Sequence, residues 1–299
     1  MTSCDPQSAG ISPSDPVPVQ LQVSAQPDSL LILPDDLDFS VVSKTGQGPG
    51  GTLIRWNLPG SPGNNFTAYT YDQQSRLIGS SEQTSFGYDQ LRLVRYQGAY
   101  LAQVYTGFDY RRGAASPKRV DAIGWVSKYE YDAQHRLAQV LVYENVGGQF
   151  KLNHRIQYEY NASGELHLTR DTMGLAFGSS LSQPGSYPVE IRYWENGDVY
   201  RQEVYNPNQT PVEPTQRVFY NQVTNPRARL HVWPQNVMTV HYPIGTGVTR
   251  LDRETHQYRY GYDAQGRLST VQQRSVTDYR DYDPRWTEWS YQEEFVYAP

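Results

Sequence analysis

The fold is decided by the stretch Tyr129-Glu130-Tyr131-Asp132-Ala133-Gln134-His135-Arg136-Leu137, because the same frame returns along the chain. Intact copies occupy residues 69–77 and 260–268, and a copy with Asn for Asp and Glu for Arg occupies residues 158–166. Two degenerate copies follow the same outline at residues 86–93 and 191–199. Self-similarity of this kind indicates a protein built from repeated structural units.

Each copy has the features of a β-hairpin. The two Tyr residues are separated by one position, so both point to one face of a strand. Asp or Asn then stands first in a type I turn, where its side chain accepts hydrogen bonds from backbone N–H groups two residues on. Gly164 and Gly266 fall where a bulged hairpin needs positive φ, and Ser75 and His135 are less favourable there. The returning strand opens with Arg-Leu, and the Arg side chain reaches back to the Asp or lies over a Tyr ring.

These positions are assigned structural roles and no catalytic ones. The residues concerned are Tyr71, Asp72, Arg76, Tyr131, Asp132, Arg136, Tyr160, Gly164, Tyr262, Asp263, Gly266 and Arg267.

Composition supports an all-β chain and excludes several classes of protein. Tyr contributes 25 of the 299 residues, and aromatic residues favour strands over helices. With 26 basic against 31 acidic residues, the chain lacks the positive excess of a protein that binds nucleic acid. A mean hydropathy of -0.70 and the lack of any long apolar run exclude a membrane-spanning helix.

The repeated frame resembles the YD repeats of Rhs-type proteins, whose units read Tyr-x-Tyr-Asp-x-x-Gly-Arg-Leu, and of shorter Bacteroidota lipoproteins built from the same motif. The resemblance implies an antiparallel meander of such hairpins that forms a large curved sheet or an open barrel. In the long Rhs proteins the hairpins wind into a shell around a cargo. This chain is too short to enclose a protein, so encapsulation is not carried over.

The N-terminal segment is expected to be a tether. Residues 1–19 are polar, rich in Pro and without periodicity, and residues 20–299 are expected to form a single domain of repeated hairpins. Cys4 is the only cysteine, so the fold has no disulfide framework. A small residue before Cys4 and a Pro/Ser-rich linker after it resemble the lipidation site of a bacterial lipoprotein, which implies a charged and apolar leader upstream of Met1.

The sequence offers little support for catalysis, a cofactor or a metal. Its histidines have no H-x-H or H-E-x-x-H spacing, so no zinc site is predicted. There is no G-x-S-x-G or phosphate-binding motif, and the one thiol lies in the tether. The chain is therefore predicted not to be an enzyme and to need no cofactor.

The C-terminal segment interleaves acidic and aromatic residues, a combination suited to binding sugars. The predicted ligand-binding residues are Trp286, Trp289, Tyr291, Asp283 and Glu288. A structural interpretation also exists, in which these aromatics are simply the last strands of the sheet. The alternative function is a carbohydrate-active surface hydrolase, because two carboxylates held beside an aromatic platform can cleave a glycosidic bond. Its carboxylates would come from Asp278, Asp281, Asp283, Glu288, Glu293 and Glu294.

Together these features favour a non-catalytic cell-envelope lipoprotein with a structural role or a glycan- or peptide-binding role. The expected location is the cell envelope, either anchored by lipid to the outer membrane or exported. The expected partners are a glycan or an envelope protein, with no nucleic acid and no membrane-spanning segment.

Lipidation of Cys4 can be tested directly. In the native host, Cys4→Ser should abolish incorporation of a labelled fatty acid and release the protein from the membrane fraction, because no other thiol can carry the lipid. Equal labelling of the native and Cys4→Ser proteins would contradict the expectation, as would an upstream reading frame that encodes no basic and apolar leader.

Overall fold

The computed structural model describes residues 30–299, except 60–64, 84–85, 112, 173–188, 206–215, 218, 229, 231–239, 245, 249–252 and 279–286. Cys4 and the expected tether over residues 1–19 lie outside the described residues. Within the described part, no helix has the length and apolar character needed to span a membrane.

The described chain is all-β, as predicted, with nineteen strands and one short 3-10 helix, η1 (Phe39–Val41). The strands are β1 (Leu30–Leu31), β2 (Leu53–Asn57), β3 (Phe66–Tyr71), β4 (Leu77–Gln83), β5 (Asp89–Gln97), β6 (Tyr100–Asp109), β7 (Ala122–Tyr131), β8 (Leu137–Val146), β9 (Gln149–Tyr160), β10 (Leu166–Thr172), β11 (Val189–Glu195), β12 (Asp198–Tyr205), β13 (Gln216–Arg217), β14 (Phe219–Thr224), β15 (His241–Ile244), β16 (Thr246–Val248), β17 (Arg253–Tyr262), β18 (Leu268–Asp278) and β19 (Ser290–Tyr297).

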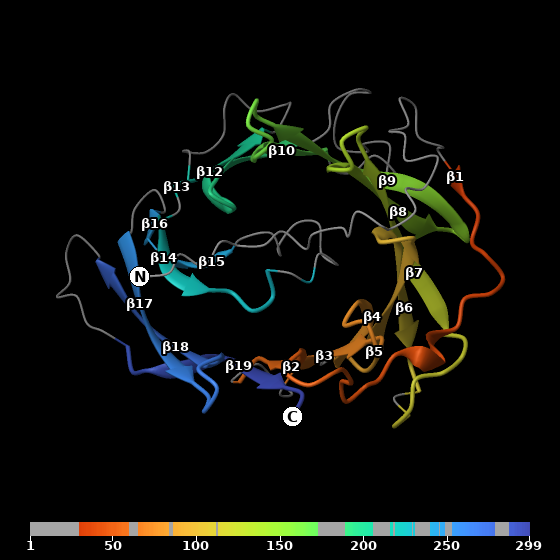
Figure 1. Cartoon of the computed structure of the whole chain (residues 1–299), viewed down its shortest axis with the longest axis horizontal. Coiled ribbons are helices and arrows are strands. Elements are labelled where there is room, and N and C mark those ends of the chain that lie inside the picture. Colours follow the sequence, from red (N-terminus) through yellow and green to blue (C-terminus); the bar gives the residue numbers. More distant parts are fainter. Residues whose placement is uncertain are drawn as a thin grey trace.

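The strands form an antiparallel meander that closes on itself. Consecutive strands pair from β2 through to β13, and β16 to β19 continue the ladder. β19 then pairs with β2, with Phe295 opposite Trp56, and the sheet becomes a closed barrel. Figure 1 looks into the ring of strands. In the described part of the chain, closure pairs the first and last long strands of the meander, which is how a large antiparallel sheet avoids edge-to-edge association.

A second, two-stranded sheet lies inside the ring. β14 pairs with β15 in antiparallel register, with Phe219 opposite Ile244. Figure 1 shows this pair within the circle of barrel strands. Residues 219–228, 230 and 240–244, called the inner hairpin below, contribute Leu230 and Tyr242 to the barrel core.

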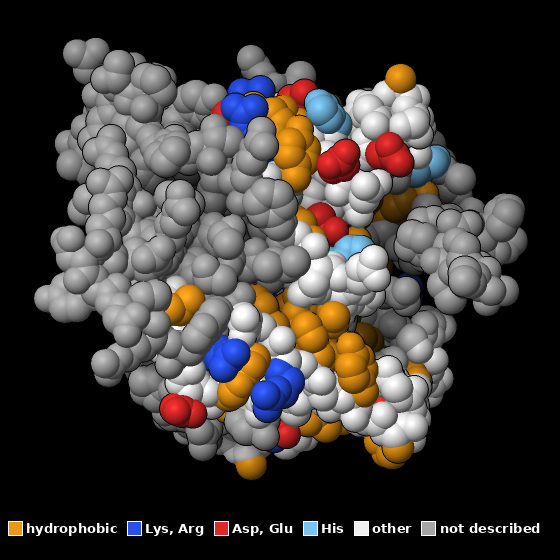
Figure 2. Space-filling model, turned by 90° about the vertical axis from the view of Figure 1, so that its left-hand side faces the viewer, with side chains coloured by type: hydrophobic (Ala, Val, Ile, Leu, Met, Phe, Trp, Pro, Cys, Tyr) orange, Lys and Arg blue, Asp and Glu red, His pale blue; other side chains and the backbone are white. Residues whose placement is uncertain are grey.

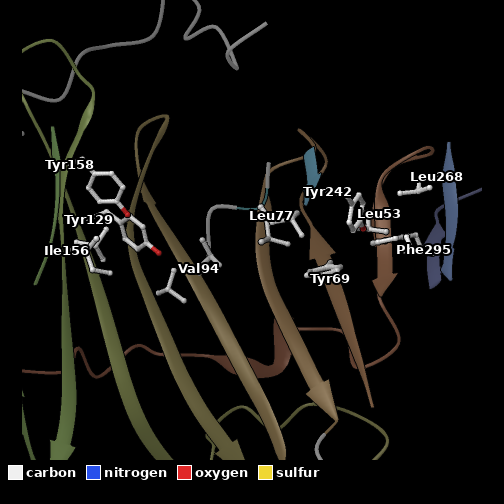
Figure 3. Packing of buried hydrophobic residues seen from close by; sticks show 14 residues of the cluster. Leu53, Tyr69, Leu77, Val94, Tyr129, Ile156, Tyr158, Tyr242, Leu268 and Phe295 are labelled. Atoms are coloured by element: carbon white, nitrogen blue, oxygen red, sulfur yellow. The ribbon is translucent and has the colours of Figure 1, made fainter. Parts of the chain in front are cut away.

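The inner face of the barrel carries the larger hydrophobic cluster. Every second residue along these strands points inward, and Tyr69, Tyr129 and Tyr158 are buried there with aliphatic neighbours. Figure 3 shows the side chains of this cluster directed from neighbouring strands toward the interior. In the copies at 69–77, 129–137 and 158–166 both Tyr residues pack against this inner cluster, as the spacing predicts. In the copy at 260–268 only Tyr260 does so, because Tyr262 is 55% exposed.

A second cluster lies on the outer face of β5 to β9, beneath an N-terminal strap formed by residues 30–47. Phe39 and Val42 of the strap are buried against outward residues such as Leu91 and Tyr143. Gly79 permits the close approach, since a Cβ there would lie 2.6 Å from Val42 Cγ2. The Lys44 ammonium fixes the strap by donating to the Asp89 and Asp109 carboxylates, at 2.7 Å each. Because this strap covers the wall there, outward positions on β5 to β9 are part of the core.

The predicted turn chemistry is confirmed in detail. Asp132 Oδ1 accepts from the backbone N–H groups of Gln134 and Arg136, each at 2.9 Å. Asp132 Oδ2 accepts from Arg136 Nε at 2.8 Å. Burial alone would raise the pKa of Asp132, but hydrogen bonds from the backbone and side chain of Arg136 outweigh it and lower the pKa. The same bonds recur around Asp72 and Asp263.

Each Asp–Arg pair also ties its hairpin to the following strand. The Arg136 guanidinium lies over the Tyr160 ring at 4.4 Å, and the Tyr160 hydroxyl donates to Leu137 O at 2.8 Å. Equivalent contacts join Arg76 to Tyr96 and Arg267 to Tyr297. This three-part contact, called the Asp-Arg-Tyr clamp below, links three successive strands at one rim of the barrel.

The interpretation of residues 86–93 as a degenerate copy is wrong. Asp89 is the first residue of β5 and pairs with Lys44, so it does not open a turn. Phe86 and Tyr88 instead stack at the opposite end of the strands from the Tyr-Asp turns. The other degenerate copy does form a hairpin, between β11 and β12, but with the two-residue turn Asn196-Gly197 in which both residues have positive φ.

Strain in the turns can be measured by substitution. Ser75 and His135 both have φ of 62°, which is costly for a residue with a Cβ. Ser75→Gly should raise the free energy of unfolding by up to about 1 kcal/mol in urea titrations. His135→Gly should gain less, because the His135 ring stacks on Tyr100 at 5.5 Å.

Gly266 provides the reverse control. Its φ is 76° and nothing lies within 4 Å of a Cβ built there, so Gly266→Ala adds backbone strain without a clash. That variant should lose about 1 kcal/mol. A destabilised Ser75→Gly protein would contradict the assignment of strain to this position.

Candidate functional site

The structure describes part of the predicted ligand-binding set. Trp286 and Asp283 lie outside the described residues. Glu288 and Trp289 directly precede β19, and Tyr291 lies in β19 opposite Gln272. Glu288 is exposed and Trp289 is half-buried. The described members therefore gather where the last strand begins to pair with β18.

Trp289 is positioned on the outer wall of the barrel. Its ring lies beneath two guanidinium groups, with Arg259 Cζ 4.4 Å and Arg274 Cζ 4.9 Å from the ring centroid. Arg259 pairs with Gln272 and Arg274 with Gln257, so all four share one face of β17 and β18. The intervening Tyr258 and Tyr260 pack against the inner core. The outer face therefore carries a Trp-Arg-Arg cluster, defined by Trp289, Arg259 and Arg274.

Hydrogen bonds to uncharged acceptors hold the cluster in place. Arg274 donates through Nε and Nη2 to Gln257 Oε1, at 2.9 and 2.6 Å. Thr287 fastens the segment before Trp289, because its N–H donates to Ser275 O and its Oγ1 accepts from Ser275 N, each at 2.8 Å. The Trp289 ring is thus presented by a segment that is bonded to β18 before β19 starts.

Figure 2 shows the side of the barrel on which β17 lies. On the described part of this face, histidine side chains lie in the upper half among acidic, basic and hydrophobic ones, and lower down hydrophobic side chains lie beside basic ones. The lower part is at the level of β18 in Figure 1. Aromatic and cationic groups on one wall can together contact a ligand that has both apolar and anionic parts.

A second cluster, inside the barrel, surrounds Glu293. Glu293 Oε2 accepts from Trp56 Nε1 at 2.8 Å and from the Tyr242 hydroxyl at 3.3 Å. The Arg227 guanidinium covers the Trp56 ring at 3.5 Å. Trp56 and Glu293 belong to the wall, whereas Arg227 and Tyr242 belong to the inner hairpin. The carboxylate therefore joins the inner hairpin to β2 and β19.

Burial controls the titration of this interior cluster. It raises the pKa of Glu293, even though Arg227 and the hydrogen bonds from Trp56 and Tyr242 act in the opposite direction. It also raises the pKa of Tyr69, which is close to Arg227, to about 12. A second polar contact, from His241 Nδ1 to Asp198 Oδ2 at 2.8 Å, holds the inner hairpin to the β11–β12 turn.

Sequence reasoning found Glu293 only as one of several acidic residues and missed its partners. The spacing of Glu293, Phe295 and Tyr297 could have placed Glu293 on the inward face, because residues two apart in a strand share a face and the other two are apolar. No local pattern connects Trp56 or Arg227 to it, because they are far apart in the chain. Among the described residues, no three His, Cys, Asp or Glu side chains gather as a metal site.

Comparisons with known proteins identify a similar solved structure but no family. No protein-family model matches the chain, and no curated protein matches it. A porin-like protein from Bacteroides uniformis ATCC 8492 aligns with a TM-score of 0.46 and 11% sequence identity, covering 83% of this chain and 99% of that one.

The raised pKa of Glu293 predicts that the stability of the folded protein depends on pH. The folded protein favours the protonated acid, so stability is lost as the pH rises from the ordinary Glu value of 4.5 through the higher folded value. Glu293→Gln has the shape of the protonated acid and does not titrate. Its melting temperature relative to the native protein should therefore increase between about pH 3 and about pH 7.

Glu294→Gln is the matched control. Glu294 accepts a hydrogen bond from Asn57 Nδ2 on the neighbouring wall strand β2, and this contact does not involve the inner hairpin. Its difference from the native protein should not follow the same rise. A Glu293→Gln difference that falls toward neutral pH would show that the ionised carboxylate is the stabilising form.

Proposed function

We propose that this chain is a non-catalytic cell-envelope protein that binds a glycan on the outer wall of its barrel, at the Trp-Arg-Arg cluster. The observation that carries the proposal is the Trp289 ring, half-buried on the wall and held between side chains of β17 and β18. The part of the ring that stays exposed beside the two guanidinium groups offers a platform for the apolar face of a sugar, and the surrounding polar groups supply orientation.

The envelope location rests on the sequence. Cys4 and the Pro-rich tether are suited to hold a barrel away from a membrane by a lipid, and the resemblance to short YD-repeat lipoproteins agrees with this. A tethered barrel would present its wall to polymers at the cell surface. Binding therefore needs only a rigid wall with an accessible platform.

The alternative, a carbohydrate-active hydrolase, is favoured by one observation, the raised pKa of Glu293. A general acid of a glycosidase needs such a carboxyl group. However, Glu293 faces the interior with Phe295, whereas the Trp-Arg-Arg cluster faces outward from the same part of the wall. The sugar platform and the perturbed carboxylate are thus on opposite faces, which supports binding without hydrolysis.

Replacement of Trp289 tests the proposed function. Trp289→Ala should abolish retention of the protein on the cognate glycan of an array, and its melting temperature should change little because the ring is only half-buried. Truncating a buried aromatic usually costs about 3 to 5 kcal/mol. A loss of that size would show that Trp289 is core and would reject the platform.

Phe86→Ala is a control for exposed aromatics, because Phe86 is 81% exposed and lies in the turn between β4 and β5. This variant should bind as the native protein does. Glycan release by the native protein that stops in Glu293→Gln would instead establish the hydrolase.

A further inference from the structure

We infer that one rim of the barrel docks on the surface of a lipid bilayer with anionic headgroups, through a patch formed by Ile32, Phe86 and Tyr110. This rim is the one opposite the Tyr-Asp turns, and the three residues are called the rim patch below. The inference rests on the proposed envelope location. It goes beyond the proposed glycan site, because it concerns β4 to β9 and their loops instead of the Trp-Arg-Arg cluster.

The rim patch contains the most exposed large hydrophobic side chains of the described chain. Ile32 is 91% exposed, Phe86 is 81% exposed and Tyr110 is 58% exposed. Single apolar residues scattered over a surface are ordinary, whereas a group of them in one region marks a contact with another protein or with a membrane. The three largest exposed fractions occur at one end of the barrel, which favours such a contact.

Strand direction places the three residues at the same rim. β4 and β6 run away from the Tyr-Asp turns, so Phe86 after β4 and Tyr110 after β6 lie at the opposite rim. β9 begins at that rim, and Leu31 pairs with its Phe150, which brings Ile32 to the same end. β5 and β9 are four strand spacings apart, so the patch follows an arc of about 20 Å. An arc of this length suits an extended surface.

Ring contacts hold the two aromatic members in place. Phe86 stacks on Tyr88 with ring centroids 6.4 Å apart, and Tyr110 meets the same ring edge-on at 5.9 Å. Tyr88 in turn meets Phe108 edge-on at 5.1 Å, and Phe108 meets Trp125 at 5.4 Å. Phe86 and Tyr110 are therefore supported by rings of the barrel and exposed to solvent. Side chains that are already ordered lose less conformational entropy when a contact buries them.

The loop between β6 and β7 adds positive charge at this rim. Residues 110–121 carry the cations Arg111, Arg112, Lys118 and Arg119 against one carboxylate, Asp121. Arg111, Lys118 and Arg119 are exposed, and the loop is braced by a hydrogen bond from Arg111 Nη2 to Arg119 O at 3.2 Å. Exposed cations beside a bilayer are attracted by anionic lipids, and aromatic side chains favour the level of the headgroups.

Other acids near this loop are engaged within the protein. Asp89 and Asp109 are buried, and Lys44 Nζ donates to both carboxylates at 2.7 Å. Arg111 Nε also lies 3.2 Å from Asp109 Oδ1. Asp38 of the strap accepts from its own neighbour Ser40. The exposed surface of the loop therefore remains mainly positive.

The described chain begins at the same rim. Leu30, its first residue, pairs with Lys151 near the turn between β8 and β9. A lipid on Cys4, as proposed, would be joined to this rim through residues 5–29. The lipid would then set the distance of the barrel from the bilayer, and the rim patch would set its orientation.

A second copy of the chain is the competing occupant of an exposed apolar patch. Two copies joined through this rim would bring two positively charged loops together, which costs energy, whereas anionic headgroups carry the opposite charge. Charge therefore favours the bilayer.

The experiment measures binding of the full chain to lipid vesicles by cosedimentation. The chain carries Cys4→Ser, so that no attached lipid contributes. Vesicles of equal parts phosphatidylcholine and phosphatidylglycerol are compared with vesicles of phosphatidylcholine alone. The protein should bind the anionic vesicles about tenfold more tightly, and binding should weaken as salt is raised.

Variants in the same background test the rim patch. Phe86→Ala combined with Tyr110→Ala should weaken binding to the anionic vesicles about tenfold or more, because apolar area no longer leaves water. Tyr262→Ala is the matched control, since Tyr262 is 55% exposed but follows β17 into a turn at the opposite rim. This control should bind as the unaltered background does. The melting temperatures should agree, because all three side chains are exposed.

Three results would overturn the inference. They are no binding of the background protein to anionic vesicles, an equal loss in Tyr262→Ala and in the double variant, and a dimer in analytical ultracentrifugation that the double variant separates. The last result would assign the patch to a second copy.

Retention on the glycan array is measured separately and depends on Trp289. The Phe86→Ala and Tyr110→Ala double variant should keep it. Lipid docking can therefore fail while glycan binding stands, and the reverse also holds.

Discussion

The carboxylate of the turn Asp is the contact on which the architecture depends. In each complete repeat it accepts the backbone N–H groups that close the turn and also pairs with Arg Nε. That pairing places the guanidinium over a Tyr of the next strand, whose hydroxyl reaches back to the hairpin. A local turn thereby specifies the position of a third strand. The Asp-Arg-Tyr clamp recurs at three hairpins along one rim, and at each of them it positions the next strand of the meander.

The fold was largely predictable because these interactions are local. The spacing of the two Tyr residues fixes their face, and the Asp, Gly and Arg positions fix the turn. Closure was not predictable, since the β19–β2 pairing joins Phe295 to Trp56 across most of the chain. A contact between distant residues also explains the wrong assignment of residues 86–93. Their sequence matches the repeat pattern, but Asp89 pairs with Lys44 of the strap.

The candidate site, too, was predictable from local sequence only in part. The interleaved acids and aromatics pointed to the C-terminal segment, and Trp289 lies on the outer wall there. Its two arginine neighbours could not be found from spacing alone, because β17 and β18 bring Arg259 and Arg274 together only through their register. Glu293 was grouped with residues of the other face, although its role is to join the inner hairpin to the wall. Neighbouring residues of a strand point to opposite faces of the sheet, so Trp289 and Glu293 lie on different faces although both belong to the same acidic and aromatic segment.

The proposed function makes the barrel a rigid support that presents a glycan-binding platform on its outer face at β17 to β19. Hydrogen–deuterium exchange of the full chain, with and without a saturating glycan that the native protein retains on the array, tests this most directly. The glycan should slow exchange in peptides covering residues 253–278 and 287–297 and leave exchange in β5 to β9 under the strap unchanged. Protection centred on the inner hairpin, or none on β17 to β19, would contradict it.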